Sequence, residues 1–296
     1  MKNAKPKIAL ALGILCISIF PILVRLHYTN GLISAFYRMF IAAVLLLPYV
    51  IITRKFKLPP TTITLLAVVS GLVFATDIAI WNIAIQKSSA TQATLLANLS
   101  PVWVGIGSFL FLKNRPSTNF WIGTAFALFG MLILVGFNTF SQLNFDLAFV
   151  LALLSGMLYA TYILISKNIL SQLDVLSFMS IVLFSSSLFL GLICWATGEA
   201  FTGFSNTAWL VLFVQGAVCQ LTAWLLISYT TQHLRATRVS LSLLGQAVLA
   251  TFLAWLFLGE IMSWDRIIGA VFLLLGIRIT FYNKLIGFKN LKKIVK

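Results

Sequence analysis

Residues 123–130 read GTAFALFG, and residues 269–276 read GAVFLLLG, so two glycines recur at an offset of 146 positions. The same offset aligns Ala90-Thr91 with Ala236-Thr237 and Phe111-Leu112 with Phe257-Leu258, without a gap. Chance similarity between two apolar stretches does not normally preserve both glycine pairs and the helix breaks in register. The sequence therefore indicates an internal duplication.

The composition indicates a membrane protein. The 296 residues are 60% hydrophobic, 14% aromatic and only 9% charged, which is more apolar surface than one soluble core can bury. A membrane-crossing helix needs about 20 apolar residues. Dividing the chain at its polar breaks predicts ten spans, approximately 8–24, 33–52, 64–85, 92–112, 120–137, 147–166, 176–197, 207–230, 240–258 and 266–283.

The cations follow this division. With both termini in the cytoplasm, sixteen Lys and Arg residues fall in inside segments and three, Arg25, Lys87 and Arg266, fall outside. This is the positive-inside pattern, and it favours an even number of spans. The net charge of +15 is thus a topology signal rather than a nucleic-acid surface. We expect a multi-pass protein of the bacterial inner membrane.

Two halves of five spans each must enter the membrane from opposite sides, because five is odd. The predicted fold is therefore an all-α integral membrane protein with ten transmembrane helices as two inverted five-helix repeats. The expected divisions are residues 1–140, residues 147–283 and a basic cytoplasmic tail, 284–296. Inverted halves permit alternating access to a site near the midplane.

Several motifs resemble the drug/metabolite transporter superfamily, specifically the ten-span group with two EamA domains. They are Ala35-Phe36-Tyr37-Arg38, the run from Leu95 to Pro101, and Leu256-Phe257-Leu258-Gly259-Glu260. The resemblance implies a central cavity and export or exchange of metabolites such as amino acids, without an enzyme reaction. The chain departs from that group at Lys113, where Glu is usual, and at Gln246-Ala247, where Pro is frequent.

Asp77 is the one acid clearly inside a predicted span. An ionised carboxylate there costs at least ~3 kcal/mol, so we expect it to be paired, protonated or facing water. It is a candidate proton-coupling group or contact for a substrate amine, and the alternative is a hydrogen-bonded structural Asp. Arg38 lies at a similar depth and is a candidate ion-pair partner, although its place near an outer helix end favours a snorkelling side chain.

Polar and indole side chains recur at helical spacing in the third, fourth, eighth and ninth spans, which are repeat counterparts. We predict that they line one substrate cavity; the alternative is interhelical hydrogen bonding and lipid contact. Pro101 should bend the fourth span. The predicted cavity residues are Asp77, Trp81, Thr94, Asn98, Gln220, Trp224, Ser228, Ser242 and Gln246.

The sequence contains no nucleophile-and-base constellation and no ATP-binding motif, and its three cysteines are far apart. We therefore expect no enzyme activity, no cofactor and no metal site. The expected partners are a small-molecule substrate and the lipid bilayer, with no nucleic acid, in a monomer or homodimer. Alternating access by a secondary carrier is the favoured mechanism, and a passive channel for small polar solutes is the alternative.

Overall fold

The computed structural model describes residues 4–26, 28–87, 90–112, 115–136 and 146–282, and within these ranges it contains helices and no strands. One stretch, η1, is a π-helix. The helices are α1 (Ala4–Ser18), α2 (Phe20–Arg25), α3 (Gly31–Ile52), α4 (Thr61–Lys87), α5 (Ala90–Ala97), α6 (Ser100–Phe111), α7 (Thr118–Val135), α9 (Leu147–Ile169), α10 (Val175–Ala196), α11 (Asn206–Val214), η1 (Gln215–Thr222), α12 (Ala223–His233), α13 (Ala236–Leu243), α14 (Gly245–Leu258) and α15 (Trp264–Phe281).

These elements combine into ten spans. Nine stretches of the described chain are long and apolar enough to cross a membrane, and four of them are interrupted helices: α1–α2, α5–α6, α11–η1–α12 and α13–α14. The tenth helix, α15, has 18 residues and carries three charged side chains. Asp265 is in its first turn and Arg278 in its last, where a span meets water. The predicted fold class is confirmed.

The contact between α7 and α15 shows how the two halves are related. A Cβ atom added at Gly123 would lie 2.5 Å from the backbone oxygen of Gly276, and one at Gly130 would lie 2.6 Å from that of Gly269. Residue numbers rise along α7 as they fall along α15, so the helices are antiparallel. Gly123 contacts Gly276, which is the repeat counterpart of Gly130, and Gly130 contacts Gly269, which is the repeat counterpart of Gly123. A pseudo-two-fold axis therefore passes between these helices.

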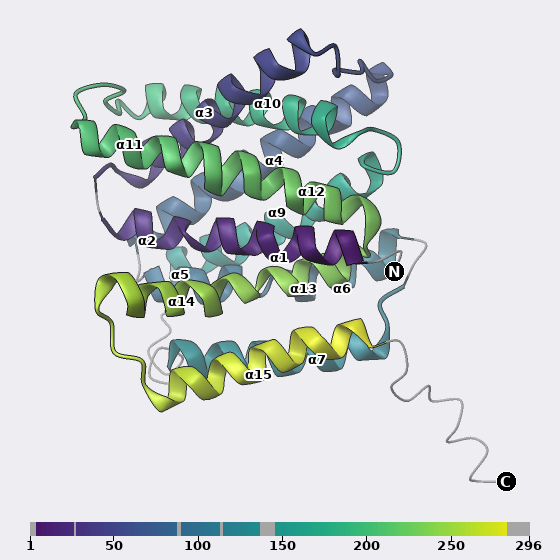
Figure 1. The fold of residues 1–296 in the computed structure, drawn as a ribbon, viewed down its shortest axis with the longest axis vertical. Coiled ribbons are helices and arrows are strands. Elements are labelled where there is room, and N and C mark those ends of the chain that lie inside the picture. The colour runs from purple at the N-terminus through teal and green to yellow at the C-terminus, as the bar shows by residue number, and fades with distance from the viewer. Residues whose placement is uncertain (1–3, 27, 88–89, 113–114, 137–145, 283–296) are drawn as a thin grey trace, which may run out of the picture.

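The other helices obey the same symmetry. The third span, α4, packs on the sixth, α9, as the eighth span packs on the first through α12 and α1. The second and seventh spans, α3 and α10, pack on each other at one end of the stack, and α7 and α15 form the opposite end (Figure 1). Helices of opposite halves therefore meet along the whole length of the axis.

The fourth and ninth spans break at equivalent depths. The fourth is interrupted between Ala97 and Ser100, with Pro101 in the first turn of α6, since proline has no N–H for the helical ladder. The ninth is interrupted at Leu244, which is the repeat counterpart of Asn98, although no proline is present there. The break is thus a property of the repeat and not of proline alone.

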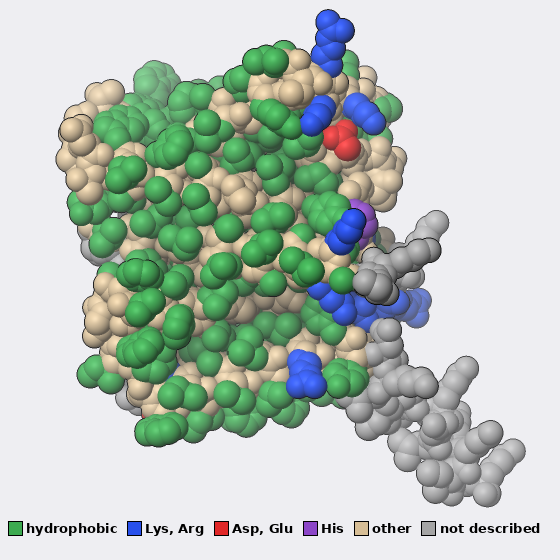
Figure 2. Space-filling model, viewed as in Figure 1, with side chains coloured by type: hydrophobic (Ala, Val, Ile, Leu, Met, Phe, Trp, Pro, Cys, Tyr) green, Lys and Arg blue, Asp and Glu red, His purple; other side chains and the backbone are tan. Residues whose placement is uncertain are grey.

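The described chain begins and ends on the same side of the bundle. The Lys7 ammonium lies 5.4 Å from the ring centre of Phe281, and Arg238 donates from Nε to the backbone oxygen of Thr280 at 3.2 Å. On the face drawn in Figure 2, most Lys and Arg atoms gather toward the end where α1 begins, and the middle is hydrophobic. This arrangement fits an even number of crossings.

We predict that Gly130→Ala destabilises the protein by about 1–3 kcal/mol, because the new methyl group would overlap the backbone of α15. Thermal unfolding of the detergent-purified protein measures the effect. Gly245→Ala is the matched control, since a Cβ there would lie 3.5 Å from Ile277, an ordinary contact. Equal melting temperatures for the two variants would contradict the close packing of α7 on α15.

Candidate functional site

Asp77 is buried in the middle of α4 and is hydrogen-bonded to the neighbouring helix, α9. Its side chain is 7% exposed, and its Oδ1 accepts a hydrogen bond from Ser155 Oγ of α9 at 2.5 Å. Ser155 was not among the predicted site residues, because a serine in an apolar helix carries no signal of its partner. The carboxyl group thus lies between the third and sixth spans.

Arg38 is also buried, which corrects the expectation that it snorkels to the interface. The side chain is 7% exposed, and its guanidinium lies over the ring of Phe20 from α2, 4.3 Å from the ring centre. Arg38 was a candidate ion-pair partner of Asp77, and the described structure contains no ion pair between the two side chains. The physical reason is that α2 supplies an aromatic surface for Arg38 while Ser155 of α9 holds Asp77.

The π-helix η1 brings two glutamines into the interior of the eighth span. Gln215 accepts a hydrogen bond from Ser34 Oγ of α3 at 2.7 Å. Gln220 is fully buried, and neither its Nε2 nor its Oε1 has a hydrogen-bond partner among the described residues. Single-turn π segments within helices are frequent at functional sites. The segment of the first half that corresponds to η1 is regular helix within α4, so the π-helix breaks the repeat symmetry.

An aromatic cluster lies one turn from Gln220. The ring of Phe74 stacks on Tyr162 at 4.4 Å between ring centres, and it lies 4.7 Å from Trp224. Tyr159 and Tyr162 of α9 both meet Trp224 edge-on, at 6.1 and 5.5 Å. Trp224 Nε1 is buried without a partner in the described structure. The cluster joins the third, sixth and eighth spans.

These side chains share one neighbourhood. The helix α3, which carries Arg38, packs on η1, and α9 contacts both Asp77, through Ser155, and Trp224, through Tyr159. At Gly216 the π-helix runs against the backbone of α3, where a Cβ would lie 3.4 Å from the Arg38 carbonyl oxygen. We call Arg38, Asp77, Ser155, Gln220 and Trp224 the polar centre.

The polar centre differs in composition from the predicted cavity. It contains three predicted cavity residues, Asp77, Gln220 and Trp224, and it draws on the second and sixth spans in addition to the third and eighth. Two other predicted residues bond elsewhere: Ser228 Oγ donates to the Met179 sulfur at 3.1 Å, and Ser242 Oγ donates to the Arg238 carbonyl at 2.7 Å.

The remaining predicted cavity residues are half-buried. No hydrogen bond or ring contact joins any of them to the polar centre in the described part of the chain. They belong to the third, fourth and ninth spans. The polar centre therefore contains no side chain from the fourth or the ninth span. These residues are Trp81, Thr94, Asn98 and Gln246.

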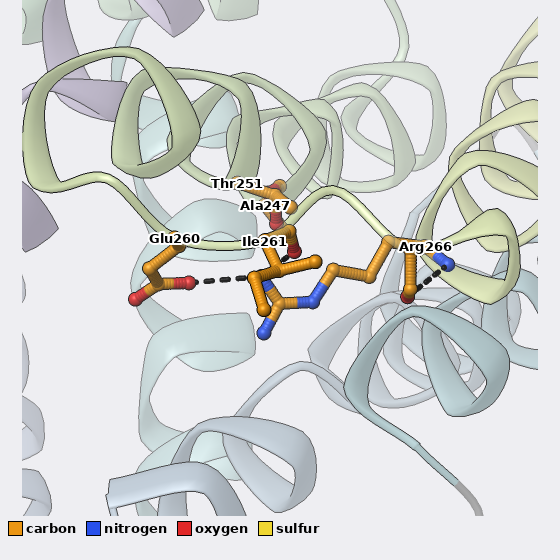
Figure 3. A network of polar contacts seen from close by, with 6 residues as sticks. Ala247, Thr251, Glu260, Ile261 and Arg266 are labelled. Atoms are coloured by element: carbon orange, nitrogen blue, oxygen red, sulfur yellow. Dashed lines mark hydrogen bonds and ion pairs between the residues drawn. The ribbon is translucent and has the colours of Figure 1, made fainter.

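Glu260, in the motif that resembles the family, lies outside the polar centre. Its Oε2 accepts from Arg266 Nη1 at 2.9 Å, and the same nitrogen donates to the Ile261 carbonyl oxygen at 3.1 Å (Figure 3). Both side chains of the pair are about a quarter to a third exposed, 26% and 34%. This contact holds the loop between α14 and α15, as expected for a solvated helix end.

The described residues contain no group of three or more His, Cys, Asp or Glu side chains that could hold a metal ion. Cys16, Cys194 and Cys219 are free thiols. The polar centre is therefore built from hydrogen-bonding, charged and aromatic side chains.

A ten-span inverted repeat with a buried polar centre defines a membrane transporter. The family model described as "EamA-like transporter family" matches residues 5–136 and again residues 146–282. The chain belongs to the EamA-like transporter family, as the motifs of the second, fourth and ninth spans indicated.

Similar proteins carry related names. The chain is 24% identical over 249 residues to "Uncharacterized transporter YdfC" of Bacillus subtilis (strain 168), covering 83% of this chain and 80% of that protein. It is 24% identical to an "Uncharacterized transporter" of Archaeoglobus fulgidus, covering 92% and 95%. A solved crystal structure matches with a TM-score of 0.79 and 15% identity, covering 94% of this chain and 98% of that one. That likeness shows the fold.

We predict that Gln220→Leu stabilises the empty protein by about 1–3 kcal/mol, because an apolar side chain of similar size replaces a fully buried amide without partners. Ser34→Ala is the opposite case, since it leaves the buried Gln215 without its partner and should lower the melting temperature. Thermal unfolding in detergent compares the two. A lower melting temperature for Gln220→Leu would show that the amide is hydrogen-bonded in the empty protein.

Proposed function

We propose that this transporter carries a small metabolite, an amino acid or a related compound, by alternating access as a secondary carrier in export or exchange. The observation that supports this most directly is the antiparallel α7–α15 contact, which makes the two halves near-equivalents across an axis between them. Such halves can exchange conformations and expose a site near the midplane to each side in turn. The polar centre is the proposed substrate site.

Counterflow in proteoliposomes tests the mechanism. Vesicles loaded with an unlabelled compound should accumulate the labelled compound transiently, and the initial rate should saturate with concentration. A panel of amino acids and related metabolites is the first set of substrates. Flux that neither saturates nor shows counterflow would instead identify a passive channel, and the absence of flux for every compound would overturn the proposal.

Asp77 is the proposed coupling group. Among the residues that the structure describes, it is the one acid buried within a span, and its partner Ser155 is a neutral hydroxyl. A carboxyl group without a cationic partner is able to hold a proton when water leaves the site and to release it when water returns. Proton binding at Asp77 would then accompany each cycle.

We predict that Asp77→Asn abolishes the response of transport to a pH gradient, because the amide cannot exchange a proton. Initial rates with and without a gradient, across a range of pH, provide the measurement. Asp146→Asn is the control, since Asp146 caps α9 at the bundle end and Asn also caps helices well. Unchanged gradient dependence in Asp77→Asn would leave Asp77 a structural role.

We further propose that both termini face the cytoplasm of a bacterial cell, with the protein in the inner membrane. The bundle end that holds Lys7, Lys167 and Arg238 is rich in cations. The opposite end holds the acids Asp146, Glu199, Glu260 and Asp265. The positive-inside rule assigns the cation-rich end to the cytoplasm.

This orientation predicts opposite labelling of two exposed threonines. Thr61 begins α4 at the cation-rich end, and Thr202 lies between α10 and α11 at the other end. In intact cells, a membrane-impermeant maleimide should label Thr202→Cys and not Thr61→Cys. The unsubstituted protein controls for its own thiols, two of which are buried. Labelling of Thr61→Cys alone would invert the topology.

A further inference from the structure

Three side chains of the polar centre have buried polar atoms without partners in the described structure. Arg38 Nε, Trp224 Nε1 and both polar atoms of Gln220 form no hydrogen bond, and the three side chains are 7%, 3% and 0% exposed. More than nine in ten buried polar groups in proteins have a partner. An amide with neither its donor nor its acceptor satisfied, inside a membrane protein, indicates a place that a ligand occupies.

The unpartnered atoms come from neighbouring parts of the fold. Gly216, four residues before Gln220 in η1, packs against α3, where a Cβ would lie 3.4 Å from the Arg38 carbonyl oxygen. Trp224 follows Gln220 by four residues and meets the ring of Tyr159. Ser155, one turn before Tyr159 on α9, donates a hydrogen bond to Asp77. The second and eighth spans therefore present these groups to one region.

The chemistry of the group favours an anion. A guanidinium and an indole offer only N–H donors, and the amide of Gln220 offers two N–H donors and one acceptor oxygen. Arg38 carries its charge at every physiological pH, and its contact with Phe20 supplies no counter-charge. Asp77 does not compensate it through an ion pair. Hydrogen bonds from a guanidinium to a carboxylate are about twice as strong as neutral ones and match its planar fork.

We propose that Arg38, Gln220 and Trp224 bind the carboxylate of the transported compound, and that Phe74, Tyr162 and Trp224 contact an apolar or aromatic body joined to it. This inference rests on the proposed transport function and assigns the part of the substrate that each of these two groups of side chains contacts. Two classes of compound carry a carboxylate joined to an apolar body. One is an amino acid, whose ammonium group would face Asp77, and the other is a carboxylic acid without an amine.

Binding of three related probes to the full chain in nanodiscs, measured by calorimetry, tests the proposal. The probes are 3-phenylpropanoate, which has the carboxylate alone, phenethylamine, which has the amine alone, and phenylalanine, which has both. We expect the two carboxylates to bind at least tenfold more tightly than phenethylamine. Tighter binding of phenylalanine than of 3-phenylpropanoate indicates an amino acid, and the reverse order indicates a simple acid.

Two variants assign the binding groups. Arg38→Gln and Gln220→Leu should each weaken 3-phenylpropanoate at least about tenfold. Arg278→Gln is the matched control, because Arg278 also lies over an aromatic ring, that of Tyr282, but in the last turn of α15. If Arg38→Gln does not fold, Gln220→Leu carries the test, since it fills the same volume with an apolar side chain.

Three outcomes would overturn the proposal: phenethylamine binding as tightly as the carboxylates, binding of none of the probes, or equal losses in Arg38→Gln and Arg278→Gln. Counterflow separates this failure from that of the transport function. Saturable counterflow of a compound without a carboxylate would leave the carrier mechanism standing and remove the carboxylate site. Saturable binding of 3-phenylpropanoate without any counterflow would leave the carboxylate site standing and remove the carrier mechanism.

Discussion

The structure depends on one constraint: a polar group inside the hydrocarbon core finds no water, so the protein must supply its partner. Many hydroxyl groups meet this requirement locally, by donating to the carbonyl four residues earlier in their own helix, as Ser18, Thr76 and Thr231 do. In the polar centre the requirement is not met for three side chains, and among the described residues it is also not met for Trp103, Ser108 and Thr124. Gln220, Arg38 and Trp224 retain unpartnered atoms in the described structure, although their spans pack closely around them.

A second consequence of the membrane is the close approach of helices without large side chains. Gly123 and Gly130 meet Gly276 and Gly269 backbone to backbone, and each contact is repeated across the axis by its counterpart. Dispersion contacts replace the hydrophobic effect between such helices. The symmetry extends to the breaks in the fourth and ninth spans, but not to η1. The polar centre thus combines a symmetric scaffold with one asymmetric element, the π-helix that carries Gln220.

Several residues of the polar centre were predictable. Asp77 is conspicuous as a single acid within a span, and the spacing of Gln220 and Trp224 places both on one face of the eighth helix. Ser155 and Tyr159 were not predictable, since serine and tyrosine are ordinary residues of membrane helices. Arg38 was expected to extend its side chain toward water. Its distance from the helix end suggested water, whereas α2 covers it with Phe20.

The sequence by itself determined the number of spans, their opposed halves and the family, because hydropathy, cation placement and the 146-residue register are all properties read along the chain. The tertiary structure alone decided which spans surround the centre. Lateral order among helices depends on packing between residues far apart in sequence, such as Asp77 with Ser155 and Ser34 with Gln215. A span's periodicity shows which residues share a face, but not which helix that face meets.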